Sequence, residues 1–298
     1  MYFDTAEGPV FRPPSEADSF ILRVTIGCSH NRCTYCNMYR SVSFRLRTME
    51  EIVPQVERAK RYGESIRRVF LADGNALVLL TERLLEILAL LRQELPKLRR
   101  VSCYAGPRDM LSKTPEELLA LREAGLQLVY YGLESGDDEV LQYVRKGVTA
   151  QQAVAAGQRI VAAGMKLSLM VIAGLGGRLW SEQHARHTAL AINAIRPHMF
   201  SVLTLMLYRG SELRQAYEAG QFAVLSPAEI AGEMQALLTM INLPEGSHCL
   251  FRSNHISNYA PLAGSLPQDK DKLLAACRQM KGQLAGLTEW DPYNTVEE

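Results

Sequence analysis

The sequence lacks the features that mark membrane-spanning, secreted and nucleic-acid-binding proteins. Its charges nearly cancel, with 33 Lys+Arg against 32 Asp+Glu in 298 residues. The chain therefore lacks the excess of positive charge that is typical of proteins that bind nucleic acid or anionic lipid. The longest apolar stretch, 167–177, is interrupted by Ser168 and is far too short to cross a bilayer. The first residues carry no basic and apolar leader of the secretory type. We therefore expect a cytoplasmic protein without a membrane partner. The charge balance disfavours a nucleic-acid partner, and RNA as a substrate is kept as the alternative.

Cysteine is scarce and unevenly placed. Six cysteines are too few for a disulfide scaffold in a chain of 298 residues. Three of them, Cys28, Cys33 and Cys36, nevertheless fall within nine residues. In a reducing compartment such a group indicates metal ligation, whereas the other three, which are scattered, are typical of small core residues.

The chain does have a regular alternation of strand and helix patterns. Apolar, β-branched runs predict buried strands at 20–26, 66–72, 100–105, 127–133, 166–173 and 199–207. Helical periodicity follows these runs, and strict alternation predicts a parallel sheet with right-handed crossovers. Six units are two short of a closed eight-unit barrel. We therefore predict an α/β fold of the partial (βα)6 TIM-like barrel type with a C-terminal extension.

The pattern changes after about Pro244. An irregular segment, 245–267, precedes a final predicted helix at 269–284. We expect a partial barrel over residues 1–244 and a C-terminal extension over 245–298 that covers the barrel mouth. Parallel sheets bind ligands at the carboxyl ends of their strands, so the turns after each predicted strand are the candidate site.

The cysteine group forms one loop directly after the first predicted strand. Three thiolates can ligate three irons of a cubane cluster and leave the fourth iron open to a cofactor or substrate. The alternative is a structural zinc site that uses the three cysteines and His30, in an α/β binding protein without catalysis. Structural zinc sites usually take ligand pairs from separated elements, so a single loop favours the iron–sulfur interpretation.

The loop and the later motifs resemble the radical S-adenosylmethionine (SAM) superfamily over about residues 18–220. Members carry C-x-x-x-C-x-x-C after the first strand, with an aromatic residue before the third cysteine. Here that residue is Tyr35, which the resemblance implies to be a cofactor-binding residue. The first spacing in this chain is four residues instead of three. The resemblance implies a [4Fe–4S] cluster on Cys28, Cys33 and Cys36. It also implies reductive cleavage of SAM to a 5′-deoxyadenosyl radical that abstracts hydrogen from an unknown substrate.

The resemblance extends to the ends of the second and fourth predicted strands. Asp73 and Gly74 occupy the place of the motif that meets the methionine amino group of SAM. Glu134 and Ser135, in a segment similar to the family's GLESG motif, are implied to approach the ribose, and Lys146 the SAM carboxylate. Ordinary alternatives are a turn at Asp73, helix capping by Ser135 and a solvated Lys146.

Two further strand ends complete the implied SAM site. Residues 171–177 are similar to the family's GxIxG segment, so Ile172 and Gly174 are implied to pack on adenine. The segment fails as a dinucleotide fingerprint, because Leu179 stands where the third glycine is needed. Met206, at the end of the sixth strand, is implied to touch SAM and is otherwise a core methionine.

The resemblance implies least about the residues that contact the substrate. The segment 251–259 is dense in polar side chains, and we expect Arg252, Asn254 and His255 to face the barrel mouth and contact substrate. His255 is the candidate for proton transfer. The alternative is a surface loop that joins two helices. The expected partners are a small-molecule substrate and a reductant such as flavodoxin or ferredoxin.

Overall fold

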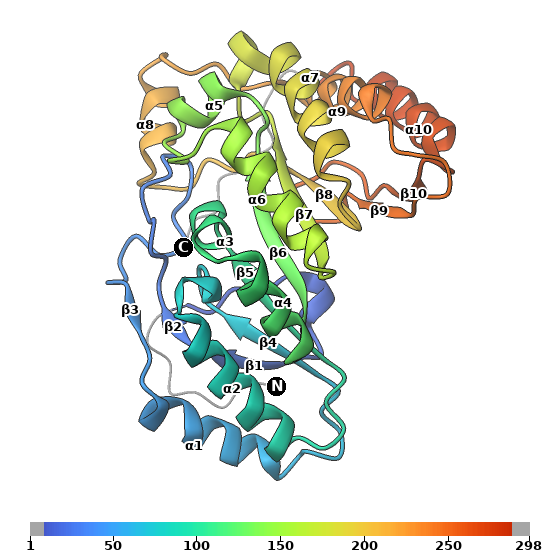
Figure 1. The fold of residues 1–298 in the computed structure, drawn as a ribbon. Coiled ribbons are helices and arrows are strands. Elements are labelled where there is room, and N and C mark those ends of the chain that lie inside the picture. The colour runs from blue at the N-terminus through green and yellow to red at the C-terminus, as the bar shows by residue number, and fades with distance from the viewer. Residues whose placement is uncertain (1–8, 288–298) are drawn as a thin grey trace. The chain divides into compact units, whose positions relative to one another are not determined.

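The structure, a computed structural model, describes residues 9–287 (Figure 1). These residues form two compact units. The first unit contains the chain up to Asn31 together with Met38–Tyr131 and Arg159–Leu167. The second contains Arg32–Asn37, Gly132–Gln158 and the chain from Ser168 on. The start of the chain, where we expect no secretory leader, lies outside the described residues.

Parallel strands form the centre of the first unit. They lie in the order β1 (Phe20–Arg23), β4 (Arg68–Ala72), β5 (Arg100–Ala105) and β6 (Leu126–Glu134). All four residues of β1 are buried, as a strand covered on both faces requires. A separate antiparallel pair is formed by β2 (Thr25–Ile26) and β3 (Arg45–Leu46).

Helices cover the first unit's sheet. They are η1 (Pro14–Glu16), α1 (Met49–Lys60), η2 (Ala76–Val78), α2 (Thr81–Glu94), α3 (Pro107–Ser112) and α4 (Pro115–Glu123). A capping box between Thr48 and Glu51 starts α1. Helix α2 contacts both α1 and α4 (Figure 1), so the leucine-rich face of α2 is buried.

The second unit continues the alternation of strands and helices. Its helices are α5 (Asp138–Tyr143), most of α6 (Ala150–Ala162), α7 (Gly177–Ile195), α8 (Glu212–Glu218), α9 (Pro227–Met240) and α10 (Lys270–Gln283). Strands β7 (Lys166–Ala173), β8 (Met199–Thr204) and β9 (Cys249–Arg252) are parallel, and β10 (Ala263–Leu266) is antiparallel to β9. Helix α9 packs between α7 and α10, and the three lie side by side (Figure 1).

The predicted α/β class with parallel strands is confirmed, and a strand forms at each of the six predicted places. The run 20–26 is not one strand, because Thr25–Ile26 pairs with β3 while Arg47 donates its backbone N–H to Val24. The prediction of an irregular segment at 245–267 was wrong. Two strands form there, and burial of alternate β9 residues stabilises the first. The six-unit count and the boundary at residue 244 stay predictions.

No helix within residues 9–287 is both long enough and apolar enough to cross a membrane. This agrees with the absence of a long apolar run in the sequence.

Candidate functional site

A buried ion pair organises the first unit's strand ends. Arg23, the last residue of β1, donates from Nε to Asp73 Oδ1 at 3.0 Å and from Nη2 to Oδ2 at 2.7 Å. Both side chains are fully buried. The Gly27 N–H donates to the same Asp73 Oδ2 at 2.8 Å. Burial raises the pKa of the Asp73 carboxyl, and the Arg23 guanidinium and Gly27 N–H oppose that rise. The pair therefore fixes the residue that precedes Cys28.

The turn after β4 fits closely against Cys28. Asp73 adopts a left-handed backbone with φ of 76°, and Gly74 donates its N–H to the Gly27 carbonyl at 3.0 Å. A Cβ on Gly74 would lie 2.6 Å from the Cβ and 2.7 Å from the Cα of Cys28, so only glycine is accommodated. One residue further, Asn75 accepts the Ser29 N–H. The Asp-Gly-Asn turn thus shapes the start of the cysteine loop.

In the second unit, the loop segment with the other two cysteines is anchored through Thr34. Its N–H donates to the carbonyl of Val144, after α5, at 3.0 Å, and its carbonyl accepts the N–H of Leu213 in α8 at the same distance. The Cys36 N–H donates to the Cys33 carbonyl, which makes a tight turn. These bonds hold Cys33 and Cys36 in a defined loop, where both remain partly exposed.

Three predicted SAM-binding residues meet in the second unit. Tyr35 hydrogen-bonds to the Glu134 carboxylate, and Lys146 Nζ donates to Glu134 Oε1 at 2.9 Å. The side chains of Glu134 and Lys146 are 12% and 13% exposed, so their charges are only weakly screened. Burial, Glu134 and the two loop cysteines raise the pKa of Tyr35 well above its usual range. Tyr35 is therefore a neutral hydrogen-bond donor.

Gly132 makes room for this arrangement. Glu134 ends β6 in a left-handed conformation with φ of 62°, and its carboxylate folds back over Gly132. A Cβ at residue 132 would lie 2.0 Å from Glu134 Oε1 and 3.3 Å from Lys146 Nζ. The first glycine of the GLESG-like segment is thus explained by the position of the acid two residues later.

Ser135 lies apart from that group. Its side chain is buried, and its Oγ hydrogen-bonds to His184 Nδ1 at 2.8 Å and accepts the Asp137 N–H. His184 Nε2 lies 3.1 Å from the carbonyl of Ile172, on β7. The hydroxyl therefore joins the end of β6 to α7, and its expected contact with ribose stays a prediction.

Glu233 of α9 holds the segment 171–177, which is predicted to bind adenine. No motif in the sequence indicated this role of Glu233. Its side chain is buried, accepts the Gly174 N–H at 2.6 Å through Oε1 and binds the Ser181 hydroxyl through Oε2. A capping box between Ser226 and Glu229, with proline at the first helical position, starts α9 and was the available sequence signal for this helix.

An apolar cluster lies beside the remaining predicted cofactor residues of the second unit. It consists of Val140, Val144, Leu175, Leu205, Leu207, Leu213 and Phe222. Tyr35 and Ile172 are half-buried and pack against it, as do Tyr143 and Trp180. Met206 is buried and accepts from the Tyr208 hydroxyl through Sδ. The cluster supplies the apolar surface on which a flat base can pack.

The polar segment predicted to contact substrate lies at the carboxyl end of β8. Ser257 Oγ accepts the Thr204 N–H at 3.1 Å, and Asn258 Oδ1 accepts from the Thr204 hydroxyl at 2.9 Å. His255 is half-buried, and burial lowers its pKa. Arg252 and Asn254 are exposed. The segment is thus attached to the carboxyl end of β8, and its expected contact with substrate stays a prediction.

His255 has a defined tautomer in this setting. Ser257 donates its backbone N–H to His255 Nδ1 at 3.2 Å, and Ser257 Oγ lies 2.8 Å from the same nitrogen. Because Nδ1 accepts, a neutral His255 carries its proton on Nε2. The side chain therefore presents one N–H donor.

The cysteines fall into two sets that differ in burial. Those of the loop are free and partly exposed, whereas the other three are buried. Burial raises the pKa of Cys249 to about 12 and that of Cys277 to about 11, and raises that of Cys103 further. Within residues 9–287, no three His, Cys, Asp or Glu side chains converge closely enough to hold a metal ion. The loop thiols nevertheless suit iron–sulfur ligation by their number, spacing and accessibility.

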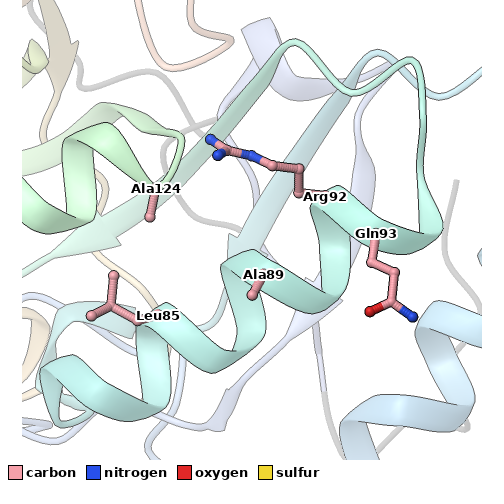
Figure 2. A pocket seen from close by; sticks show the side chains of 5 residues that line it. All are labelled: Leu85, Ala89, Arg92, Gln93 and Ala124. Carbon is pink, nitrogen blue, oxygen red and sulfur yellow. The ribbon is translucent and has the colours of Figure 1, made fainter.

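A surface hollow in the first unit contains none of the predicted site residues. Figure 2 shows its lining from α2 and from Ala124, which follows α4. Its residues are Leu85, Ala89, Arg92, Gln93 and Ala124. Arg92 donates from Nη2 to the Glu123 carbonyl, so the guanidinium holds the end of α4. Its lining contains no acid, histidine or thiol, and therefore does not indicate a catalytic site.

The fold, the three-thiol loop and the Tyr35–Glu134–Lys146 group define a class of protein. A model of the radical SAM superfamily matches residues 22–189, more than half of the chain, and the chain therefore belongs to this superfamily. Members are enzymes that bind a [4Fe–4S] cluster and SAM.

Similarity to individual members is low. The chain is 22% identical to the heme chaperone HemW of Bacillus subtilis (strain 168) over 241 residues, which cover 78% of this chain and 61% of HemW. The chain thus spans less than two thirds of that relative.

Two solved structures share the fold. The cobalamin-dependent SAM radical enzyme OxsB has a TM-score of 0.60 at 15% identity, covering 74% of this chain and 41% of OxsB. Methylornithine synthase PylB has a TM-score of 0.53 at 17% identity, covering 92% and 83%.

Proposed function

We propose that this chain cleaves SAM reductively and uses the 5′-deoxyadenosyl radical to abstract hydrogen from a small-molecule substrate. The observation that carries the proposal is the loop with Cys28, Cys33 and Cys36, inside the region matched by the superfamily. These three cysteines would hold the cluster, which would supply the one electron needed to cleave the C5′–S bond of SAM into methionine and the radical. A one-electron donor such as flavodoxin or ferredoxin completes the proposal.

The second unit's residues are proposed to orient SAM. Glu134 accepts from Tyr35 and Lys146, and a carboxylate has about four acceptor positions, so it can also accept from ribose hydroxyls. The Lys146 ammonium beside it suits the SAM carboxylate. Ile172 and Gly174, next to the apolar cluster and fixed by Glu233, are proposed to receive adenine.

In the first unit, Asp73 and Gly74 are proposed to act on the cysteine loop. Asp73 holds Gly27 through its carboxylate, and Gly74 admits Cys28 at close range. The chain's own residues thereby fix the backbone that carries the first thiol. A contact of these two residues with the SAM amino group stays a prediction.

The C-terminal part is proposed to form the substrate side. The segment that contains Arg252, Asn254 and His255 is attached to the end of β8, and neutral His255 donates from Nε2. Exposed Arg252 and Asn254 would bind polar groups of the substrate. A radical enzyme needs such cover, because water must be kept from a reactive carbon radical.

The proposed function is tested by anaerobic reconstitution of the full chain with ferrous iron and sulfide. Dithionite and SAM are then added, and 5′-deoxyadenosine is measured by mass spectrometry. A brown protein that forms 5′-deoxyadenosine supports the proposal. A colourless protein that retains zinc and forms no 5′-deoxyadenosine contradicts it and supports the zinc-stabilised binding protein.

Glu134→Gln is expected to weaken SAM binding by about 1–3 kcal/mol, because a charged acceptor between Tyr35 and Lys146 is lost. Cluster iron is expected to stay unchanged, since the substituted side chain is not a thiol. Affinity is measured by titrating SAM against the EPR signal of the reduced cluster. Glu212→Gln, which breaks the exposed ion pair with Arg145, is the matched control and should bind SAM as the wild type does. Equal affinity in all three proteins would exclude the role of Glu134.

His255→Ala is expected to reduce substrate-dependent 5′-deoxyadenosine formation roughly 10- to 100-fold, which corresponds to one lost hydrogen bond to substrate. Cluster iron and slow uncoupled SAM cleavage should not change. The measurement compares 5′-deoxyadenosine formation with and without a small-molecule extract of the source cells. His248→Ala, at an exposed histidine of the same region, is the control. If both variants respond to the extract as the wild type does, His255 has no substrate role.

A further inference from the structure

Tyr39 stands where the cysteine loop returns to the first unit. The Asn31 side chain donates from Nδ2 to the Tyr39 carbonyl at 2.7 Å, and the Val42 N–H donates to the same oxygen at 3.1 Å. The Tyr39 ring packs edge-on against Phe11, with the ring centres 5.5 Å apart. Backbone and ring are therefore both held, and the hydroxyl has a fixed position.

That hydroxyl is buried without a hydrogen bond. Tyr39 is 3% exposed, and within residues 9–287 its Oη has no hydrogen-bond partner. Buried polar groups are nearly always paired, and an orphan in a native fold often marks the place of a ligand. The ring and backbone contacts account for the position of Tyr39, but none of them involves its hydroxyl group.

The groups around the Tyr39 hydroxyl are the candidates for its hydrogen-bond acceptor. Burial, Asp73, Tyr104 and Cys28 raise the pKa of Tyr39 far above its usual range, and the nearby Arg23 guanidinium opposes that rise. The hydroxyl is therefore neutral and donates. The Asp73 carboxylate already accepts from Arg23 and Gly27, and Arg23 has no acceptor atom. Within residues 9–287 none of these groups accepts from the Tyr39 hydroxyl. Of them, the sulfur of Cys28 is the acceptor whose negative charge grows when it ligates iron.

We propose that the Tyr39 hydroxyl donates a hydrogen bond to the Cys28 sulfur, or to the sulfide beside it, when the cluster is bound. This inference rests on the proposed function. A hydrogen bond to cluster sulfur stabilises the reduced, more negative state and raises the reduction potential. Tyr39 thus tunes the cluster and is not itself a ligand.

The test is the midpoint potential of the cluster in the reconstituted full chain, titrated anaerobically and followed by EPR. Tyr39→Phe should keep the iron content and shift the midpoint to more negative values, because the donor is lost while the ring remains. Tyr130→Phe is the matched control, since it removes another buried hydroxyl of the first unit, one that donates to Glu16. The control should have the wild-type midpoint.

A second substitution covers the case in which Tyr39→Phe loses its cluster. Placing 3-fluorotyrosine at residue 39 keeps the size of the side chain and makes the hydroxyl a stronger donor, so the midpoint should become more positive. Unchanged midpoints in loaded Tyr39 variants, or a change in SAM affinity alone, would overturn the inference and leave the proposed function standing. A wild-type chain that takes up no cluster would overturn the proposed function as well.

Discussion

Replacing any one of Cys28, Cys33 and Cys36 with alanine is expected to abolish the cluster, which otherwise contributes roughly four irons per chain. Each thiolate ligates one iron, and a cubane left with two protein ligands loses the chelation that holds it in the loop. The measurement is iron and sulfide content after anaerobic reconstitution, together with the broad visible absorption of the cluster.

The other three cysteines provide the controls for this experiment. Cys103, Cys249 and Cys277 are buried, and burial raises the pKa of each thiol. A thiol that stays protonated in an apolar interior is a poor iron ligand. Their replacement with serine should leave iron content unchanged. Comparable iron loss in both sets would show that the loop is not the cluster site.

Much of the fold could be predicted from the sequence, because strands buried on both faces appear as continuous apolar runs. Strand β5 and strand β7 form at the predicted bounds. Strand β9 was missed because Cys249–Arg252 is short and alternates buried and exposed residues, a pattern that resembles a loop when the paired strands are unknown.

The candidate site could be predicted as a set of strand ends, but not as a set of contacts. The motifs indicated Glu134 and Lys146 separately, and only the folded chain shows that they form an ion pair. Ser135 was expected beside ribose because it follows Glu134, yet its hydroxyl binds His184, forty-nine residues away. Contacts of that sequence separation depend on the packing of α7 and leave no local pattern.

The pairing of Arg23 is a contact that could have been predicted from the sequence. A single charged residue inside the apolar run 20–26 must be paired when that strand is buried. Asp73, at the end of the next parallel strand, was the acid within reach of the same sheet edge. Asp73 has this structural role beside its expected contact with SAM, which stays a prediction.

The buried pair leads to the second large expected effect. Asp73→Asn is expected to lower the free energy of unfolding by about 3–5 kcal/mol, because the Arg23 guanidinium keeps its charge in a fully buried site. Asparagine tolerates the left-handed backbone of residue 73 and can still accept the Gly27 N–H. The loss is therefore assigned to the missing charge. It is measured by anaerobic urea unfolding of the cluster-free chain.

Two further variants separate the buried charge from other causes. The double substitution Arg23→Met with Asp73→Asn should recover most of the lost stability, since both charges of the pair are then removed. Asp18→Asn breaks the ion pair with Arg68, in which Asp18 is 87% exposed, and should change stability by less than about 1 kcal/mol. If Asp73→Asn is as stable as Asp18→Asn, the pair does not hold the strand ends. If the double variant is no more stable than Asp73→Asn, the loss does not come from the unpaired guanidinium.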